Sequence, residues 1–131
     1  MSAVVEMTTS TDRWLDNQLA RGMRGAFAVK GELTPELAQA LLHRNDANRK
    51  LSDKKVRQYA EDIKAGNWEL NGETVILAAD GKMNNGQHRC AAVNAAGISI
   101  DTFFVFGVQR ASRMTVDQGV KRTIDQYFRM A

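Results

Sequence analysis

The residues with the clearest chemical potential lie together in the segment Asn84-Asn85-Gly86-Gln87-His88-Arg89. An alanine-rich stretch that predicts a helix follows it, and the first turn of a helix presents unpaired N–H groups and a positive dipole end. Gly86 would let the backbone approach a ligand closely, His88 adds a group that can gain a proton, and Arg89 adds a forked cation suited to phosphate oxygens. We therefore predict a phosphate-binding turn formed by Asn85, Gly86, Gln87, His88 and Arg89.

The same segment has a simpler interpretation. Asn85-Gly86 is a common turn dipeptide, beside which Arg89 could be solvated and His88 bonded to a backbone carbonyl. Short Gly-His-Arg strings arise by chance and phosphate loops vary widely, so spacing alone does not choose between the two interpretations.

Carboxylates near this segment are candidates for binding Mg²⁺ or for moving a proton beside a bound phosphate. Glu73 and Asp80 flank the predicted strand before the segment, and Asp101 and Asp117 follow the segment. Taken alone, each of them is more often a solvated charge. The single cysteine, Cys90, is expected to be a small buried thiol, because it lies among alanines on the predicted helix.

Two further groups of residues could contact a nucleotide or a nucleic acid. Trp68 could stack on a base beside Asn71, although packing in the core explains a tryptophan as well. Basic residues gather around one predicted helix start and include Lys54 and Lys55, so a contact with backbone phosphates competes with a solvated face. The cluster comprises Arg44, Arg49, Lys50, Lys54, Lys55 and Arg57.

The composition restricts the kinds of protein that can carry these groups. The chain has 131 residues, of which 44% are hydrophobic and 25% charged, as expected for one globular domain. A lone cysteine excludes an internal disulfide, and no run of residues is apolar enough to span a membrane, so we expect a cytoplasmic protein. The net charge of +3 favours anionic partners only mildly.

Turn and capping residues predict the elements that position the segment. We predict helices beginning at Thr11, Thr34 and Ser52, a hairpin turning at Asp80-Gly81, and a helix closed by Gly97. The remaining predictions are an ambiguous loop or strand over 22–33, strands over 73–78 and 98–108, a helical turn over 110–113 and a last helix from Arg122. The last pattern reaches the end of the sequence, so we expect either that this tail covers a groove or that a further domain follows.

These elements predict an α+β fold with a short mixed sheet and flanking helices. We expect a single domain, in which residues 1–33 form an N-terminal extension of a core over 34–131.

The motifs of this chain resemble those of the ParB/sulfiredoxin superfamily, whose members place Gly-x-His-Arg or Gly-Glu-Arg-Arg between a hairpin strand and a helix. The matching stretch runs from Ile76 to Val93, with Gly86 to Arg89 as its specific part. The chain is most similar to ParB-like domain proteins of phages and mobile elements, through Gly66-Asn67-Trp68, Asn71-Gly72-Glu73 and the stretch from Asp117 to Arg122.

The resemblance implies a phosphate cradle for an NTP, ATP or CTP with Mg²⁺, at Gly86 to Arg89, with an NTPase or phosphotransferase activity as one possibility. Glu73 and Asp117 lie within the segments shared with the resembling proteins, so we predict these two carboxylates as the catalytic groups. Gln87 stands where sulfiredoxin has its nucleophilic cysteine, which argues against repair of cysteine sulfinate. Two alternatives stay open: a DNA-binding or nuclease-type module, and a non-enzymatic phage-type regulator that binds a nucleotide or a host protein. A homodimer is also compatible with the resemblance.

Overall fold

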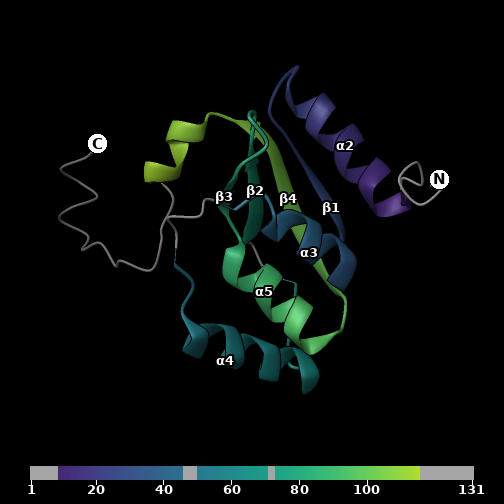
Figure 1. The fold of residues 1–131 in the computed structure, drawn as a ribbon, viewed down its shortest axis with the longest axis vertical. Helices are drawn as coiled ribbons and strands as arrows, with labels where there is room; N and C mark the ends of the chain where they lie inside the picture. The colour runs from purple at the N-terminus through teal and green to yellow at the C-terminus, as the bar shows by residue number, and fades with distance from the viewer. Residues whose placement is uncertain (1–8, 46–49, 71–72, 116–131) are drawn as a thin grey trace, which may run out of the picture.

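A four-stranded mixed sheet forms the centre of the computed structural model, which describes residues 9–45, 50–70 and 73–115 (Figure 1). The strands are β1 (Phe27–Leu33), β2 (Thr74–Ala78), β3 (Met83–Asn85) and β4 (Ile100–Val108), in the order β1-β4-β2-β3. The pairs β1–β4 and β2–β3 are antiparallel, whereas β2 and β4 run parallel. The predicted α+β class with a short mixed sheet is therefore confirmed.

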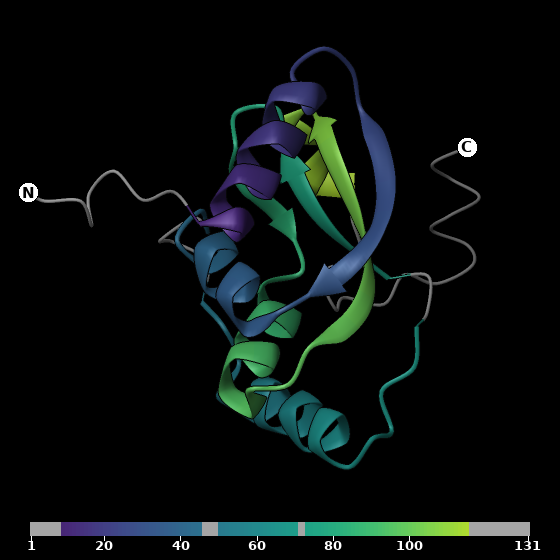
Figure 2. The same ribbon diagram turned by 90° about the vertical axis from the view of Figure 1, so that its right-hand side faces the viewer.

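Helices pack against this sheet in two groups, and each begins at a predictable signal. The described α-helices are α2 (Ser10–Gly22), α3 (Pro35–Leu42), α4 (Asp53–Lys64) and α5 (Gln87–Ala96), and a 3₁₀ helix, η1 (Arg110–Thr115), follows β4. The hydroxyls of Thr9, Thr34 and Ser52 cap the first three α-helices by accepting backbone N–H bonds. Figure 2 shows α2 and α3 on one face of the sheet, with α5 and α4 below it.

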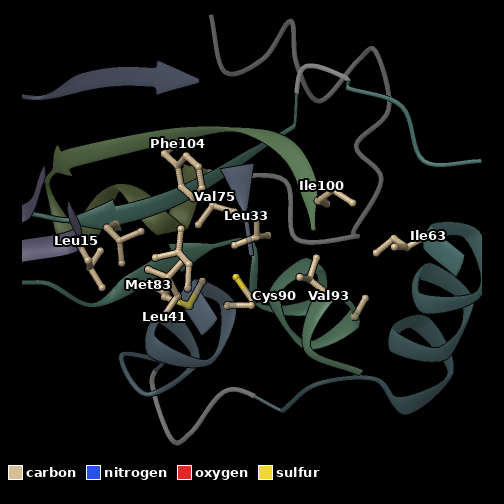
Figure 3. Packing of buried hydrophobic residues seen from close by; sticks show 14 of the residues in the cluster. Leu15, Leu33, Leu41, Ile63, Val75, Met83, Cys90, Val93, Ile100 and Phe104 are labelled. Atoms are coloured by element: carbon tan, nitrogen blue, oxygen red, sulfur yellow. The ribbon is translucent and has the colours of Figure 1, made fainter. Parts of the chain in front are cut away.

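The core lies between the sheet and α2, α3 and α5 (Figure 3). Along β4, Ile100, Thr102, Phe104 and Phe106 are buried at every second position, because alternate side chains of a strand point to the same face. Trp14 from α2 covers Phe104 edge-on, with the ring centres 5.4 Å apart. Among the described residues, no helix is both long enough and apolar enough to cross a membrane.

Three predicted elements differ from the structure or fall outside it. The first helix is capped by Thr9 and begins at Ser10, so the predicted N-cap at Thr11 was wrong by two residues. The ambiguous stretch 22–33 contains β1, which alternates exposed and covered residues despite its glycine. The predicted last helix from Arg122 lies outside the described residues.

Candidate functional site

The turn between β3 and α5 requires glycine for two separate reasons. Gly86 is the N-cap of α5 and has φ of +102°, a conformation that side chains of L-residues rarely adopt. A Cβ at this position would also lie 2.9 Å from Cγ2 and 3.0 Å from Cα of Val75 in β2. No described side chain caps α5, so its first turn keeps the N–H groups and dipole end that favour an anion.

A second helix start lies beside this turn. The backbone N–H of Ser52, the N-cap of α4, donates to Nε2 of His88 at 2.9 Å. In this arrangement Nε2 is the unprotonated nitrogen of the imidazole. The bond joins positions 36 residues apart in sequence, and it brings the first turns of α4 and α5 together.

The basic residues at the start of α4 thereby come close to the predicted phosphate-binding turn. Lys54 is exposed in the first turn of α4, and Lys55 is half-buried with its ammonium group 5.7 Å from the centre of the Tyr59 ring. The sequence presented the basic cluster and the Gly86 turn as separate candidates. The structure places Lys54 and Lys55 of this cluster in α4, whose start neighbours the start of α5, whereas Arg49 lies outside the described residues.

Arg89 occupies a different environment from the one expected of a phosphate ligand. Its side chain is only 5% exposed, and its Nη2 lies 2.5 Å from Oε2 of Glu73. Its Nη1 donates to the carbonyl oxygen of Glu73 at 3.1 Å and to Oγ1 of Thr102 at 3.0 Å. In this structure Arg89 therefore ties α5 to the beginning of β2 and to β4.

The pairing with Arg89 also defines the place of Glu73, one of the two predicted catalytic carboxylates. Its side chain is 63% exposed, and one carboxylate oxygen is held by the buried guanidinium. Asp117, the other predicted carboxylate, lies outside the described residues. The structure thus brings Glu73 to Arg89 rather than to the backbone of the Gly86 turn.

Two polar side chains beside the turn, the buried Gln87 and the half-buried Asn85, bond to backbone carbonyls of the neighbouring strands. Gln87 is 1% exposed, and its Nε2 lies 3.5 Å from the carbonyl oxygen of Met83. Asn85 donates from Nδ2 to the carbonyl oxygen of Thr74 at 3.4 Å. Both side chains support the turn from inside, so any contact of Gln87 with a ligand would come from its backbone.

Sequence reasoning missed the network that fixes the strand before the turn. Asn84 is fully buried, donates from Nδ2 to the carbonyl oxygen of Gln109 at 3.1 Å, and accepts at Oδ1 from Nη1 of Arg110 at 2.8 Å. The same nitrogen of Arg110 also donates to the carbonyl oxygen of Met83 at 2.5 Å. The one hint of this network in the sequence is an asparagine at a strand position where an apolar residue is usual. Its partner, Arg110, is 26 residues further along the chain, so local patterns do not reveal the pairing.

Trp68 packs against other side chains in the structure. Its ring meets Tyr59 of α4 edge-on with the centres 5.4 Å apart, and the guanidinium carbon of Arg89 lies 5.6 Å from its ring centre. These contacts agree with the packing interpretation of this residue. Asn71, its predicted partner in a base contact, lies outside the described residues.

Cys90 is fully buried in the core, as expected from its alanine-rich surroundings. Burial raises the pKa of its thiol from 9.0 to about 12, against the opposing effect of the nearby Arg89 charge. The thiol is therefore un-ionised at neutral pH, and a nucleophilic role for it is not supported.

This pKa predicts a loss of stability in alkali. Above pH 9 the thiol of the unfolded chain ionises, while the native thiol keeps its proton up to about pH 12. The native state then binds more protons than the unfolded state, so the free energy of unfolding should fall as pH rises through this window. Denaturant titrations at several alkaline pH values should show a steeper fall for the wild type than for Cys90→Ala. Parallel pH dependences would contradict the assignment.

The structure also contains clefts away from the turn. One of about 580 Å³ lies between α2, the end of α3 and the hairpin turn, and a second of about 530 Å³ lies beside the start of α2. Neither is lined by a residue of the Gly86 turn. Within the described ranges, no group of three His, Cys, Asp or Glu side chains could hold a metal ion.

Comparisons of the chain with protein-family models, with curated proteins and with solved structures give no match. The structure establishes an α+β domain in which the start of α4 is hydrogen-bonded to the first turn of α5, beside the Gly86 turn. Its function is therefore inferred from these residues, with the resemblance to the ParB/sulfiredoxin superfamily as a prediction.

Proposed function

We propose that the chain binds the phosphate groups of a nucleotide at the start of α5, as a domain of the ParB/sulfiredoxin type would. The observation that carries this proposal is the hydrogen bond from Ser52 to His88, which brings a second helix start to an uncapped one. Two helix N-termini side by side, with Lys54 in the first turn of α4 against the opposite charge of Asp53, favour a polyanion over a neutral ligand.

Residues from the starts of α5 and α4 have distinct parts in this proposal. Gly86 keeps the backbone open to a phosphate, and the first-turn amides of α5 donate to its oxygens. Lys54 and Lys55 balance the remaining charge of a di- or triphosphate. Arg89 acts as a positioning residue, since its guanidinium already bonds Glu73 and Thr102.

The proposal is limited to binding and includes no catalytic step. A Mg²⁺ ion accompanying an NTP would have to be held mainly by phosphate oxygens and water, because the described residues offer no group of metal ligands at the turn. Glu73 is engaged by Arg89, so it does not act as a base in this account.

A charge reversal in α4 tests the proposed site directly. Lys54→Glu should weaken binding of ATP, CTP or GTP with Mg²⁺ roughly ten-fold, because an ammonium group near the phosphates is replaced by a carboxylate. An acidic residue in the first turn of a helix is favourable, so the variant should keep its stability. Calorimetric titration of each nucleotide into the variant and the wild type measures the change.

The matched control is Lys64→Glu, which makes the same charge change at the other end of α4. This control should bind nucleotides as the wild type does. Equal weakening in both variants would mean that only the net charge matters, and the absence of saturable binding by any nucleotide would contradict the proposal. Binding of DNA without binding of nucleotides would favour the nucleic-acid alternative.

A further inference from the structure

The two edge strands of the sheet, β3 and β1, differ in length and in the partners of their outer backbone groups. At the β3 edge, the N–H of Met83 donates to the carbonyl oxygen of Arg44 at 3.1 Å, and its carbonyl oxygen accepts from Arg110. That edge has only three residues, and backbone and side-chain partners occupy it. The opposite edge is formed by β1, which has seven residues.

No described strand pairs with the outer side of β1, and Figure 2 shows this strand in front of the rest of the sheet, facing the viewer. Its pairing with β4 continues without a register shift from Phe27 to Leu33, and it contains no proline. Edge strands that are long and regular are templates for pairing with another strand, unless bulges, prolines or charges prevent it. Lys30 is the one basic residue in this strand.

The charges of β1 are complementary to those of the same strand in a second copy. Lys30 and Glu32 are both exposed and lie on the same face of the sheet, since they are two residues apart in a strand. An antiparallel pair of β1 strands related by a two-fold axis at Gly31 would place each Lys30 opposite Glu32 of the other copy. In this register, the charge of each Lys30 is therefore balanced by the opposite charge of Glu32 in the second copy.

We propose that β1 pairs with β1 of a second copy of this chain, centred on Gly31, to form a symmetric dimer with a continuous sheet. The interface is isologous, so both Lys30–Glu32 pairs form together. The same register pairs Val29 with Leu33 of the second copy. This surface is separate from the start of α5, so the dimer does not depend on the proposed nucleotide site.

Charge reversal at these two positions tests the register. Lys30→Glu and Glu32→Lys each place like charges opposite one another at two symmetric positions, so each should weaken dimerisation roughly ten-fold or more. The double variant Lys30→Glu with Glu32→Lys exchanges the two charges and should restore dimerisation to near the wild-type level. Sedimentation equilibrium of the full chain from micromolar to millimolar concentration measures all four proteins.

Carbodiimide cross-linking supplies a second readout, because it joins a lysine to a carboxylate in contact. The wild type should give a cross-linked dimer whose joined peptides contain Lys30 and Glu32, and each single variant should lose this product. A wild type that stays monomeric at every concentration would overturn the proposal. A dimer that is unaffected by the single reversals, or is not restored in the double variant, would overturn it as well. Circular dichroism of each variant establishes that a loss of dimer is not a loss of fold.

Discussion

Replacing Arg89 with alanine is expected to lower the free energy of unfolding by about 3 kcal/mol or more, because it removes one partner of a largely buried, hydrogen-bonded network. The guanidinium of Arg89 bonds Thr102 and both the backbone and the carboxylate of Glu73, and it lies beneath the ring of Trp68. Truncation would leave acceptors without a donor and open a space between α5 and the sheet. Urea denaturation of the variant and the wild type measures the loss.

A milder variant separates the contribution of the Glu73 charge from the packing of the Arg89 side chain. Glu73→Gln keeps the size and one acceptor oxygen of a side chain that is 63% exposed, so the expected loss is about 1 kcal/mol. If Arg89→Ala kept wild-type stability but lost nucleotide binding, Arg89 would be a ligand to phosphate and its positioning role would be wrong. If stability and binding fall together, the variant says little about direct contact, and for this reason Lys54→Glu is the sharper test of the site.

Replacing Gly86 with alanine is expected to lower the free energy of unfolding by about 3 kcal/mol, because strained backbone and overpacking costs combine at this position. The φ of +102° is unfavourable for alanine, and its methyl group would lie 2.9 Å from Val75, part of the buried strand β2. Relief of this contact would have to shift β3 or the start of α5. Thermal and denaturant unfolding measure the effect.

Gly97 at the other end of α5 provides a matched control. It also has a positive φ, of +69°, but a Cβ there would have no atom within 4 Å. Gly97→Ala should therefore cost only about 1 kcal/mol, which is the conformational penalty alone. Equal losses in the two variants would show that the contact with Val75 is relieved without cost, and would contradict the close packing described for the turn.

Local signals predicted most of the elements. Thr34-Pro35 and Ser52 mark helix starts, Asp80-Gly81 marks the hairpin, and Gly97 closes α5, because each acts through bonds or φ angles within a few residues. β1 was harder to predict, because its flanking glycines indicate a loop and its pairing partner, β4, comes about 70 residues later in the chain. A strand of this kind is specified by its long-range pairing more than by its own residues.

The candidate site was predictable in position but not in detail. The sequence located the turn at Gly86 and the buried Cys90, because both depend on one helix and its first turn. It did not reveal the bond from Ser52 to His88, which depends on how α4 and α5 pack. Nor did it reveal that the Arg89 guanidinium turns inward to Glu73 and Thr102, since that requires the register of β2 beside β4.

Backbone amide chemical shifts during titration with ATP and with inorganic triphosphate test the central claim most directly, because they report contacts residue by residue without any substitution. We expect saturable shifts at Gln87 and His88 in the first turn of α5 and at Ser52 to Lys55 in α4, with one dissociation constant for all of them. Inorganic triphosphate should reproduce the shifts, since the proposed contacts are with phosphate. Shifts centred on the cleft beside His43 and Arg44, or no saturable shifts in the first turns of α4 and α5, would contradict the claim.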